Sequence, residues 1–319
     1  MKKILLINLI ILFILILLIE ITFRVIFSYN VQGISENLIN KKIDYNFNAP
    51  NLNYGKAFGA KIFTDSQGFR IKKNNVIKNN KDILFIGGSV TFGPAVKTNE
   101  TFVDMLNENS KFNIRNASVF GTNLENNIKI IKNQKNLKKN VEKIFINFPL
   151  DDINSLRVSN NNNVSEEENS IKAFKRNKLI IYFNNFIRTK SATYVFLKSK
   201  IVNPQLNNYL YDLSLYENQK LLDQLELNLS ELSKIVDKEK IFFYSIPYAQ
   251  QVKTNCLELD KAEQILTNIF KKMNYEIFFL KNDFCNEEKP ATLFLKNDPV
   301  HLSKKGHILV ARILKKYLN

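Results

Sequence analysis

The stretch Ile83-Leu-Phe-Ile-Gly-Gly-Ser-Val-Thr-Phe-Gly93 decides the fold, because an apolar run ends there in a glycine-rich turn that presents one serine. Residues 83–86 form the short apolar run of a fully buried parallel strand, and Gly87 and Gly88 permit the tight exit that such a strand needs. Ser89 is then expected at the carboxyl end of the sheet, beside backbone N–H groups of the next turn. Two interpretations remain open, a nucleophile site and a plain strand-to-helix connection.

A second informative segment, Asp298-Pro-Val-His-Leu-Ser-Lys-Lys-Gly-His307, contains both histidines of the 319-residue chain. Asp298 and His301 are three residues apart at the start of an expected helix. The carboxylate can therefore accept a hydrogen bond from the imidazole and fix its tautomer, while the other ring nitrogen faces a serine. Alternatively, Asp298 caps the helix and His301 is an ordinary surface residue. Ser303 is an equally good cap, so Asp298 is not needed for that role.

From residue 82 onward, short apolar runs alternate with longer amphipathic ones, which is typical of a parallel sheet with helices on both faces. The pattern predicts strands at about 82–87, 112–117, 143–148, 240–246 and 275–280. It predicts helices at about 98–110, 122–138, 216–237, 258–273 and 303–318. Five parallel strands with right-handed crossovers give an α/β fold, a flavodoxin-like three-layer α/β/α sandwich. Residues 81–319 are enough for one well-buried core, so we expect one domain without internal repeats.

Both segments carry a resemblance to a known family. Gly87-Gly-Ser-Val-Thr-Phe-Gly93 resembles the first block of the SGNH (GDSL-type) hydrolases, and Asp298-x-x-His301-Leu-Ser-x-x-Gly-His resembles their last block. The resemblance runs from about Lys81 to the C-terminus with the order of blocks intact, and it implies the same flavodoxin-like fold. Thr64-Asp-Ser-Gln-Gly-Phe-Arg70 also resembles the segment that precedes the nucleophile block in membrane-anchored bacterial members.

The resemblance assigns roles to individual residues. Ser89 is implied to be the nucleophile, His301 the base and Asp298 the carboxylate that orients the base. Asn116-Ala-Ser-Val-Phe-Gly121 resembles the family's second block. Gly121 is therefore implied to donate its backbone N–H to the oxyanion together with that of Ser89, whereas the alternative interpretation of Gly121 is a loop glycine.

Two positions depart from the family pattern. The third block carries an Asn-Asp pair in the family, and the matching residues here are Asp151 and Asp152. An amide donates to a developing oxyanion, whereas an ionised carboxylate repels it. Asp151 can be protonated in a dry site, it can point away while Asn147 or Asn154 contributes, or the enzyme can be weak. Gly88 stands where the family usually has aspartate.

Residues 1–28 are expected to be a transmembrane anchor. Lys2 and Lys3 precede an apolar run from residue 4 to residue 23, which is long enough to cross the hydrocarbon core. Glu20 and Arg24 are i and i+4 and can pair where the helix leaves the membrane. A cleaved signal peptide is the competing interpretation, but it should have a shorter apolar core that ends in small residues, and the first alanine is Ala49. The lysines place the amino terminus inside.

Residues 29–80 are predicted to form a spacer with short strands. Within it, residues 62–70 are expected to form a hairpin whose turn uses Asp65 and Gly68 and which leaves Phe69 to pack on the main domain. Arg70 binds an anion or pairs with a carboxylate, and a structural role is favoured.

An insertion at about 154–216 separates the third and fourth expected strands. Its first part, 158–169, is polar, whereas 179–188 and 193–201 are apolar enough to be helical. A cap over the active-site mouth that also touches the membrane and a satellite helix pair on the core are both open.

Composition excludes several classes of function. The net charge is +16 and the pI is near 9.6, but the lysines are dispersed along the chain, so we expect no nucleic-acid partner. The charge suits anionic lipid or glycan instead. No cluster of cysteine and histidine suggests a metal, and no phosphate-binding or dinucleotide loop suggests a cofactor. Cys256 and Cys285 follow expected strands at one edge of the sheet, so a disulfide is predicted in an exported domain.

We therefore expect a single-pass protein of the cell inner membrane whose catalytic domain is extracytoplasmic, in the periplasm. The expected activity is that of a serine esterase or O-acyltransferase that acts on acyl esters, chiefly acetyl esters, of envelope glycans or small molecules. The alternative is a catalytically degenerate acyl- or glycan-binding module that has drifted at Gly88 and Asp151.

Overall fold

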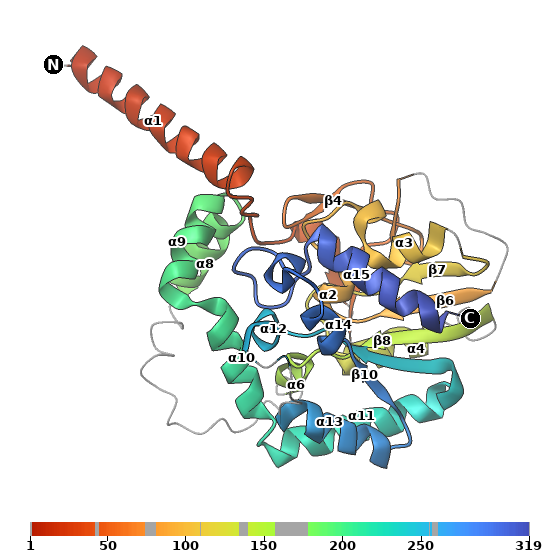
Figure 1. Ribbon diagram of the computed structural model, residues 1–319. Helices are drawn as coiled ribbons and strands as arrows, with labels where there is room; N and C mark the ends of the chain where they lie inside the picture. The colour runs from red at the N-terminus through yellow and green to blue at the C-terminus, as the bar shows by residue number, and fades with distance from the viewer. Residues whose placement is uncertain are drawn as a thin grey trace.

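A computed structural model describes residues 2–41, 45–73, 81–108, 110–133, 140–156, 178–254, 256 and 261–318. In Figure 1 a central sheet lies between helices, and α1 (Lys2–Val25) projects away from the rest of the chain. Helix α1 is long and apolar enough to cross a membrane, and none of its residues is buried.

Five parallel strands form the larger part of the sheet, from one edge inward, as predicted. They are β6 (Asp82–Ile86), β7 (Asn113–Asn116), β8 (Val141–Asn147), β9 (Ile241–Ser245) and β10 (Ile277–Phe279). Their order across the sheet is β10-β9-β8-β6-β7, and each neighbouring pair is parallel. Counted along the chain this is the order 2-1-3-4-5 of a flavodoxin-like sheet, in which the connections diverge between β6 and β8. The carboxyl ends of these two strands are therefore where a ligand site is expected.

The five predicted parallel strands belong to a larger sheet, which has eight strands among the described residues. Beyond β7 it continues through β5 (Arg70–Ile71), β4 (Ala60–Thr64) and β3 (Gly55–Ala57), all antiparallel. Strand β7 would otherwise present unpaired backbone groups, and the upstream segment satisfies part of that edge. Two further short strands, β1 (Ile39–Lys41) and β2 (Asn46–Asn48), pair separately with each other. The segment predicted as a spacer is thus an integral part of the sheet.

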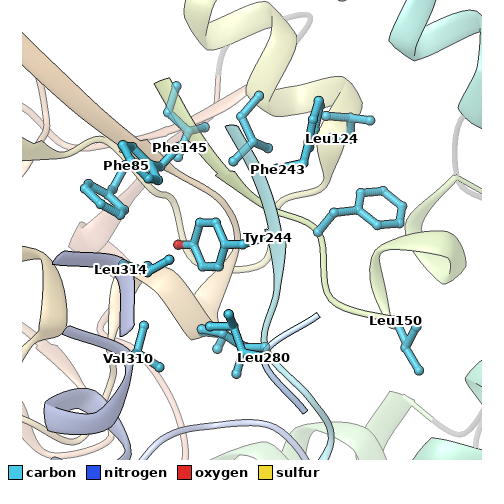
Figure 2. Packing of buried hydrophobic residues seen from close by; sticks show 14 of the residues in the cluster. Phe85, Leu124, Phe145, Leu150, Phe243, Tyr244, Leu280, Val310 and Leu314 are labelled. Atoms are coloured by element: carbon cyan, nitrogen blue, oxygen red, sulfur yellow. The ribbon is translucent and has the colours of Figure 1, made fainter. Parts of the chain in front are cut away.

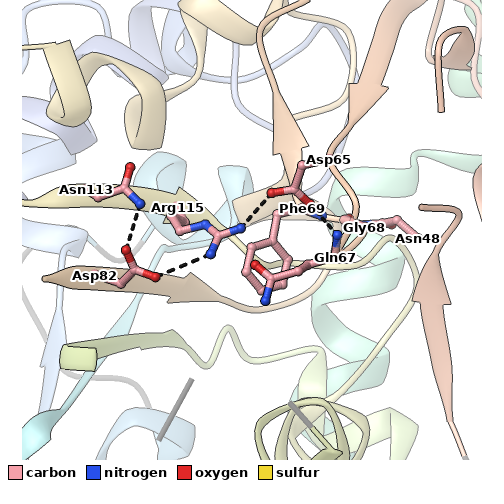
Figure 3. A network of polar contacts seen from close by, with 8 residues as sticks. All are labelled: Asn48, Asp65, Gln67, Gly68, Phe69, Asp82, Asn113 and Arg115. Carbon is pink, nitrogen blue, oxygen red and sulfur yellow. Dashed lines mark hydrogen bonds and ion pairs between the residues drawn. The ribbon is translucent and has the colours of Figure 1, made fainter. Parts of the chain in front are cut away.

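The predicted hairpin is present, and a polar network attaches it to the parallel strands. The amide N–H of Gly68 donates to the Asp65 carbonyl (3.0 Å), and Phe69 is 2% exposed in the main core. Arg115 of β7 pairs with Asp65 at 2.6 Å and with Asp82 of β6 at 3.3 Å (Figure 3). The guanidinium also lies 4.5 Å from the centre of the Phe69 ring. These contacts fix the position of the hairpin against the sheet.

Aromatic residues form the core on one face of the sheet. Phe85 stacks on Phe145 at 4.6 Å, Phe145 packs on Phe242 at 4.9 Å, and Phe242 stacks on Phe278 at 4.7 Å. This row crosses four adjacent strands, and aromatic pairs of this kind add stability beyond their buried area. Figure 2 shows Phe85 and Phe145 near Tyr244, with Val310 and Leu314 of α15 packed nearby.

Helices cover both faces of the sheet. Residue Phe102 of α3 (Phe102–Glu108) packs on Phe85, and α15 (Lys304–Leu314) contacts α3. Side chains alternate across a strand, so Phe243 points to the opposite face, where it meets Phe270 of α13. The helices of that second face are α4 (Leu124–Asn133), α11 (Gln219–Ile235) and α13 (Lys261–Lys272). The five predicted helices are therefore present, although residues 109, 134–138 and 258–260 of the predictions lie outside the described residues.

Several shorter or inserted helices complete the described chain. They are α2 (Ser89–Phe92), α6 (Asp152–Ser155), α8 (Lys178–Arg188), α9 (Ala192–Val202), α10 (Pro204–Leu215), α12 (Ala249–Thr254) and α14 (Lys281–Cys285). The predicted polar stretch at 158–169 lies outside the described residues. The two apolar stretches of the insertion are helical, as predicted, and correspond to α8 and α9.

The predicted disulfide is confirmed. Cys256 and Cys285 are bonded, with their Cα atoms 5.6 Å apart, and they close a loop of 29 residues that joins the end of α14 to the segment after α12.

Replacing both cysteines with alanine should lower the free energy of unfolding by about 3 to 4 kcal/mol, because the bond restricts the unfolded chain. Urea unfolding of the wild type and of the Cys256→Ala/Cys285→Ala variant measures the difference. Reductant should destabilise the wild type and leave the double variant unchanged. Equal stability of the two proteins under oxidising conditions would contradict this expectation.

Candidate active site

Ser89 stands where β6 ends, as the first residue of α2. Gly88 precedes it in an extended conformation, and Gly93 ends the helix with a φ of +77°. A Cβ atom added at Gly88 would lie 2.9 Å from the carbonyl oxygen of Thr122 in the loop after β7. The close approach of that backbone is a physical reason for glycine at this position, where the family resemblance leads one to expect aspartate.

The segment that follows α2 is held by a buried arginine. Arg70 donates to the carbonyl oxygens of Phe92 and Val96, each at 2.7 Å, and also to that of Gly93. Burial lowers the pKa of Arg70 to about 9, and Asp104 opposes that shift. An anion or a carboxylate was expected as the partner of Arg70. The guanidinium instead donates hydrogen bonds to backbone carbonyls. The favoured structural role is confirmed.

Ser89, His301 and Asp298 form one hydrogen-bonded chain. The Ser89 Oγ atom lies 2.8 Å from His301 Nε2. His301 Nδ1 lies 2.9 Å from each carboxylate oxygen of Asp298. The structure thus brings the three side chains that the resemblance assigned within hydrogen-bond reach of one another. A carboxylate on Nδ1 keeps the proton on that nitrogen and leaves Nε2 as an acceptor for the hydroxyl.

Asp298 is held in its ionised form. Burial alone raises the pKa of Asp298, but attraction to His301 and hydrogen bonds from the His301 ring outweigh it, and the pKa lies below its usual value. The backbone N–H groups of Val300 and His301 also donate to Asp298 Oδ1, at 3.0 and 2.8 Å. An ionised carboxylate in this position can stabilise the imidazolium that forms when His301 accepts a proton.

Two phenylalanines that sequence reasoning missed flank the imidazole. Phe58 packs edge-on to His301 with ring centres 4.9 Å apart, and Phe120 stacks parallel to it at 6.1 Å. Phe58 lies in the turn between β3 and β4 and has a φ of +49°. The upstream segment thus reaches the triad directly. The sequence shows only a Phe58-Gly59 pair between short strands. That pair predicts a turn, but it does not predict that the Phe58 ring contacts His301.

Gly121 follows Phe120 in the loop after β7 and has a φ of +74°. A Cβ atom at this glycine would meet nothing within 4 Å, so the backbone conformation rather than crowding favours glycine. Within the described part of the chain we find no hydrogen bond from the Gly121 N–H. The oxyanion role of Gly121 stays a prediction.

Asp151 is partly buried beside the triad and interacts electrostatically with two buried acids, Asp152 and Asp212. It precedes α6, and its Oδ1 atom is buried without a hydrogen-bond partner. Burial raises the pKa of Asp151, Asp298 adds to the rise, and His301 opposes it. Burial and Asp151 raise the pKa of Asp152 as well. Burial, again with Asp151, raises the pKa of Asp212 in α10 to about 7, so each of these carboxyls holds its proton to a higher pH than an exposed one.

The two asparagines considered as substitutes for Asp151 are placed differently. Asn147 ends β8, is 0% exposed, and accepts a hydrogen bond from the Ile246 N–H at 3.3 Å. Its burial keeps it away from a substrate. Asn154 lies in α6 and is partly exposed. Among the described residues, no group of three or more histidine, cysteine, aspartate or glutamate side chains is arranged to hold a metal ion.

The second histidine, His307, has a structural role in the core. His307 is fully buried, stacks on Phe102, and accepts a hydrogen bond at Nδ1 from the Phe102 N–H at 3.3 Å. Burial, with Arg70 and His301, lowers the pKa of His307 to about 3, so it is neutral at ordinary pH.

The loop that carries Asp298 is held by segments that sequence reasoning did not connect with it. The side-chain amide of Gln205 in α10 donates to the Asp298 carbonyl at 2.9 Å. The Asn297 amide donates to the Tyr29 hydroxyl at 2.8 Å and to Ser199 Oγ in α9 at 2.7 Å. The insertion and the residues just after α1 thus determine where the carboxylate lies.

Comparisons with solved structures give similar proteins at low identity. A lipase/acylhydrolase from Enterococcus faecalis is 14% identical, covers 75% of this chain and 97% of its own, and has a TM-score of 0.41. An acetyl xylan esterase from Geobacillus stearothermophilus is 15% identical, covers 76% and 96%, and has a TM-score of 0.40. A lipolytic G-D-S-L family member from Veillonella parvula is 13% identical, covers 74% and 96%, and has a TM-score of 0.38. No family model and no curated protein matches the chain.

Asp151→Asn should raise activity relative to the wild type increasingly as pH rises. The neutral acid can donate to an oxyanion, whereas ionisation above its raised pKa opposes negative charge, and the amide donates at every pH. Loss of one oxyanion donor lowers the rate by about 10²- to 10³-fold, so the increase in rate from Asp151→Asn should not exceed that factor. Measuring kcat/KM against pH for a model ester tests this.

Asp104→Asn is the matched control, because Asp104 is also a carboxyl whose pKa burial raises, but it lies in α3 and pairs with Lys72. Loss of activity in a folded Asp151→Asn protein would mean that Asp151 holds a substrate group or a neighbouring loop instead.

Proposed function

We propose that the protein is an SGNH-type serine esterase or O-acyltransferase. The observation that carries the proposal is the continuous chain from Ser89 Oγ through His301 to Asp298, with distances of 2.8 and 2.9 Å. A nucleophile, a base and an orienting carboxylate within hydrogen-bond reach make up the machinery of acyl transfer.

In the proposed reaction Ser89 Oγ attacks the carbonyl carbon of an acyl ester while His301 Nε2 takes the hydroxyl proton. The tetrahedral oxyanion is held by the N–H groups of Ser89 and Gly121 and by neutral Asp151. When this intermediate collapses, the alcohol leaves with the proton from His301, and the acyl group stays on Ser89. Water or a sugar hydroxyl then attacks the acyl-serine, His301 takes its proton, and Ser89 recovers it on release of the product.

The alternative of a degenerate binding module is less well supported. This alternative was based on two departures from the family pattern, Gly88 and Asp151. Gly88 is required by the close Thr122 carbonyl, and burial favours the neutral form of Asp151, in which it can donate. Both departures are therefore compatible with a working oxyanion site.

The proposed substrates are acyl esters, chiefly acetyl esters, of envelope glycans or of small molecules. An anchored catalytic domain suits an immobile polymer, and a net charge of +16 suits an anionic one. We propose no nucleic-acid partner and no cofactor, since the reaction needs only the side chains named above.

We further propose a single-pass protein of the inner membrane with the catalytic domain in the periplasm. The length and exposure of α1 support an anchor over residues 1–28, and Lys2 and Lys3 support an inside amino terminus. The disulfide supports an oxidising compartment. Residues 81–319 are proposed as the catalytic domain, with 29–80 contributing strands to its sheet and 154–216 as its insertion.

Ser89→Ala should lower the hydrolysis of p-nitrophenyl acetate by roughly 10⁴-fold, because the nucleophile is removed. Ser214→Ala, a change at an exposed serine of α10, is the matched control and should retain full activity. A folded Ser89→Ala protein with unchanged activity would place the reaction elsewhere.

Protease added outside intact spheroplasts should digest the catalytic domain and leave a membrane-protected fragment about the size of α1. Immunoblotting against a C-terminal tag measures the loss. Complete protection, with digestion only after the membrane is opened, would reverse the proposed orientation.

A further inference from the structure

The anchor helix is locked to the insertion before it ends. Glu20 accepts hydrogen bonds from the backbone N–H groups of Ala192 (2.7 Å) and Thr193 (3.1 Å), the first residues of α9. It also accepts from Ser191 Oγ at 2.8 Å. Arg24 pairs with Glu20 at 2.7 Å and donates to the Lys190 carbonyl. The carboxylate therefore caps α9 from within α1.

This cap fixes the height of α9 relative to the membrane. Glu20 lies five residues before Val25, the last residue of α1, which is about 7.5 Å along the helix axis. The start of α9 therefore lies beside the final turns of the anchor rather than beyond its end. Phe23 of α1 packs on Phe196 of α9 with ring centres 4.5 Å apart, and Figure 1 shows α8 and α9 at the foot of α1.

Helices α8 and α9, which adjoin the foot of the anchor, expose large apolar side chains. In α8 the residues are spaced i, i+1 and i+4 and share a face: Tyr182, Phe183 and Phe186, of which Phe183 is 58% and Phe186 53% exposed. In α9, Leu197 and Ile201 are i and i+4, and Ile201 is 85% exposed. We call these five side chains the apolar platform. Exposed aromatic and aliphatic groups on an amphipathic helix are typical of segments that lie in the membrane interface.

A groove beside α8 has the charge that suits such a surface. Its volume is about 830 Å³, and Tyr182 and Phe186 line it together with Arg24, Lys56 and Lys190, against one acid, Glu36. Cations at the foot of a membrane helix attract anionic headgroups.

We propose that the apolar platform lies in the outer surface of the membrane that holds α1, among anionic phospholipids. The occupant is lipid rather than another protein, because the Glu20 cap places the start of α9 beside the anchor, whose residues 2–19 are all exposed. The proposal rests on the anchoring of α1 and not on the ester chemistry.

Helix α9 is also connected to the loop that carries Asp298. Ser199 of α9 and Tyr29, four residues after α1, both bond to Asn297, which precedes Asp298. A platform in the membrane surface therefore holds the Asp298 loop at a fixed height above it, within reach of membrane-proximal acyl esters.

The chain contains no tryptophan, so a single introduced tryptophan reports its own surroundings. The full chain is placed, one copy per nanodisc, in anionic phospholipid with brominated acyl chains. Phe186→Trp and Phe183→Trp test the platform, Ile11→Trp in α1 marks the membrane interior, and Leu227→Trp on α11 is the matched exposed control (64% exposed). Each sample is also tested with aqueous iodide, and its ester hydrolysis is measured separately.

The proposal predicts that the bromolipid quenches both platform variants and Ile11→Trp several-fold, and that the platform tryptophans are shielded from iodide. Leu227→Trp should be quenched by iodide alone. Platform tryptophans that behave like Leu227→Trp while Ile11→Trp is quenched overturn the platform and leave the anchor intact. Platform tryptophans shielded from both quenchers indicate a protein contact and also overturn it. An unquenched Ile11→Trp overturns the anchoring and the platform together, whatever the ester hydrolysis.

Discussion

The hydrogen bond between Ser89 and His301 joins residues 212 positions apart, and both ends depend on backbone that other segments hold in place. On the serine side, Arg70 binds the carbonyl oxygens after α2 and fixes the turn that follows the nucleophile. On the histidine side, Gln205 and Asn297 hold the loop that carries Asp298. A catalytic contact tolerates only small displacements, so these supports matter as much as the three side chains themselves.

The electrostatics of the site divide its carboxyls into two kinds. Asp298 receives several donors and a cation-forming partner, so it stays ionised despite burial. Burial raises the pKa of Asp151 and of Asp212, with Asp298 adding to the rise at Asp151 and Asp151 adding to it at Asp212, so each carboxyl holds its proton to a higher pH than usual. Environments that separate the pKa values of neighbouring acids allow one to stabilise an imidazolium while another donates a hydrogen bond. A protonated Asp151 could therefore donate a hydrogen bond to an oxyanion in place of the asparagine amide that the family resemblance leads one to expect.

Much of the fold was predictable from local pattern, because buried parallel strands and amphipathic helices leave distinct periodicities. A periodicity of this kind predicts the strand before Ser89. The pair Asp298 and His301 was predicted from its three-residue spacing, and the disulfide from the position of both cysteines after expected strands. Short strands were predicted within residues 29–80, but their pairing with β7 was not, because pairing between segments far apart in the chain leaves no local signal. The placement of Phe58 on His301 and the Glu20 cap on α9 depend on contacts between distant segments, and no local pattern encodes them.

The central claim is that Ser89 is an activated nucleophile, and covalent labelling tests it most directly. The full-length protein in native membranes is treated with a fluorophosphonate and its peptides are mapped by mass spectrometry. The account predicts one adduct, on Ser89, that forms about 10⁴-fold more slowly in Asp298→Asn because the imidazole loses its orienting carboxylate. A folded protein that stays unlabelled, or that carries the adduct on another residue, would contradict the account.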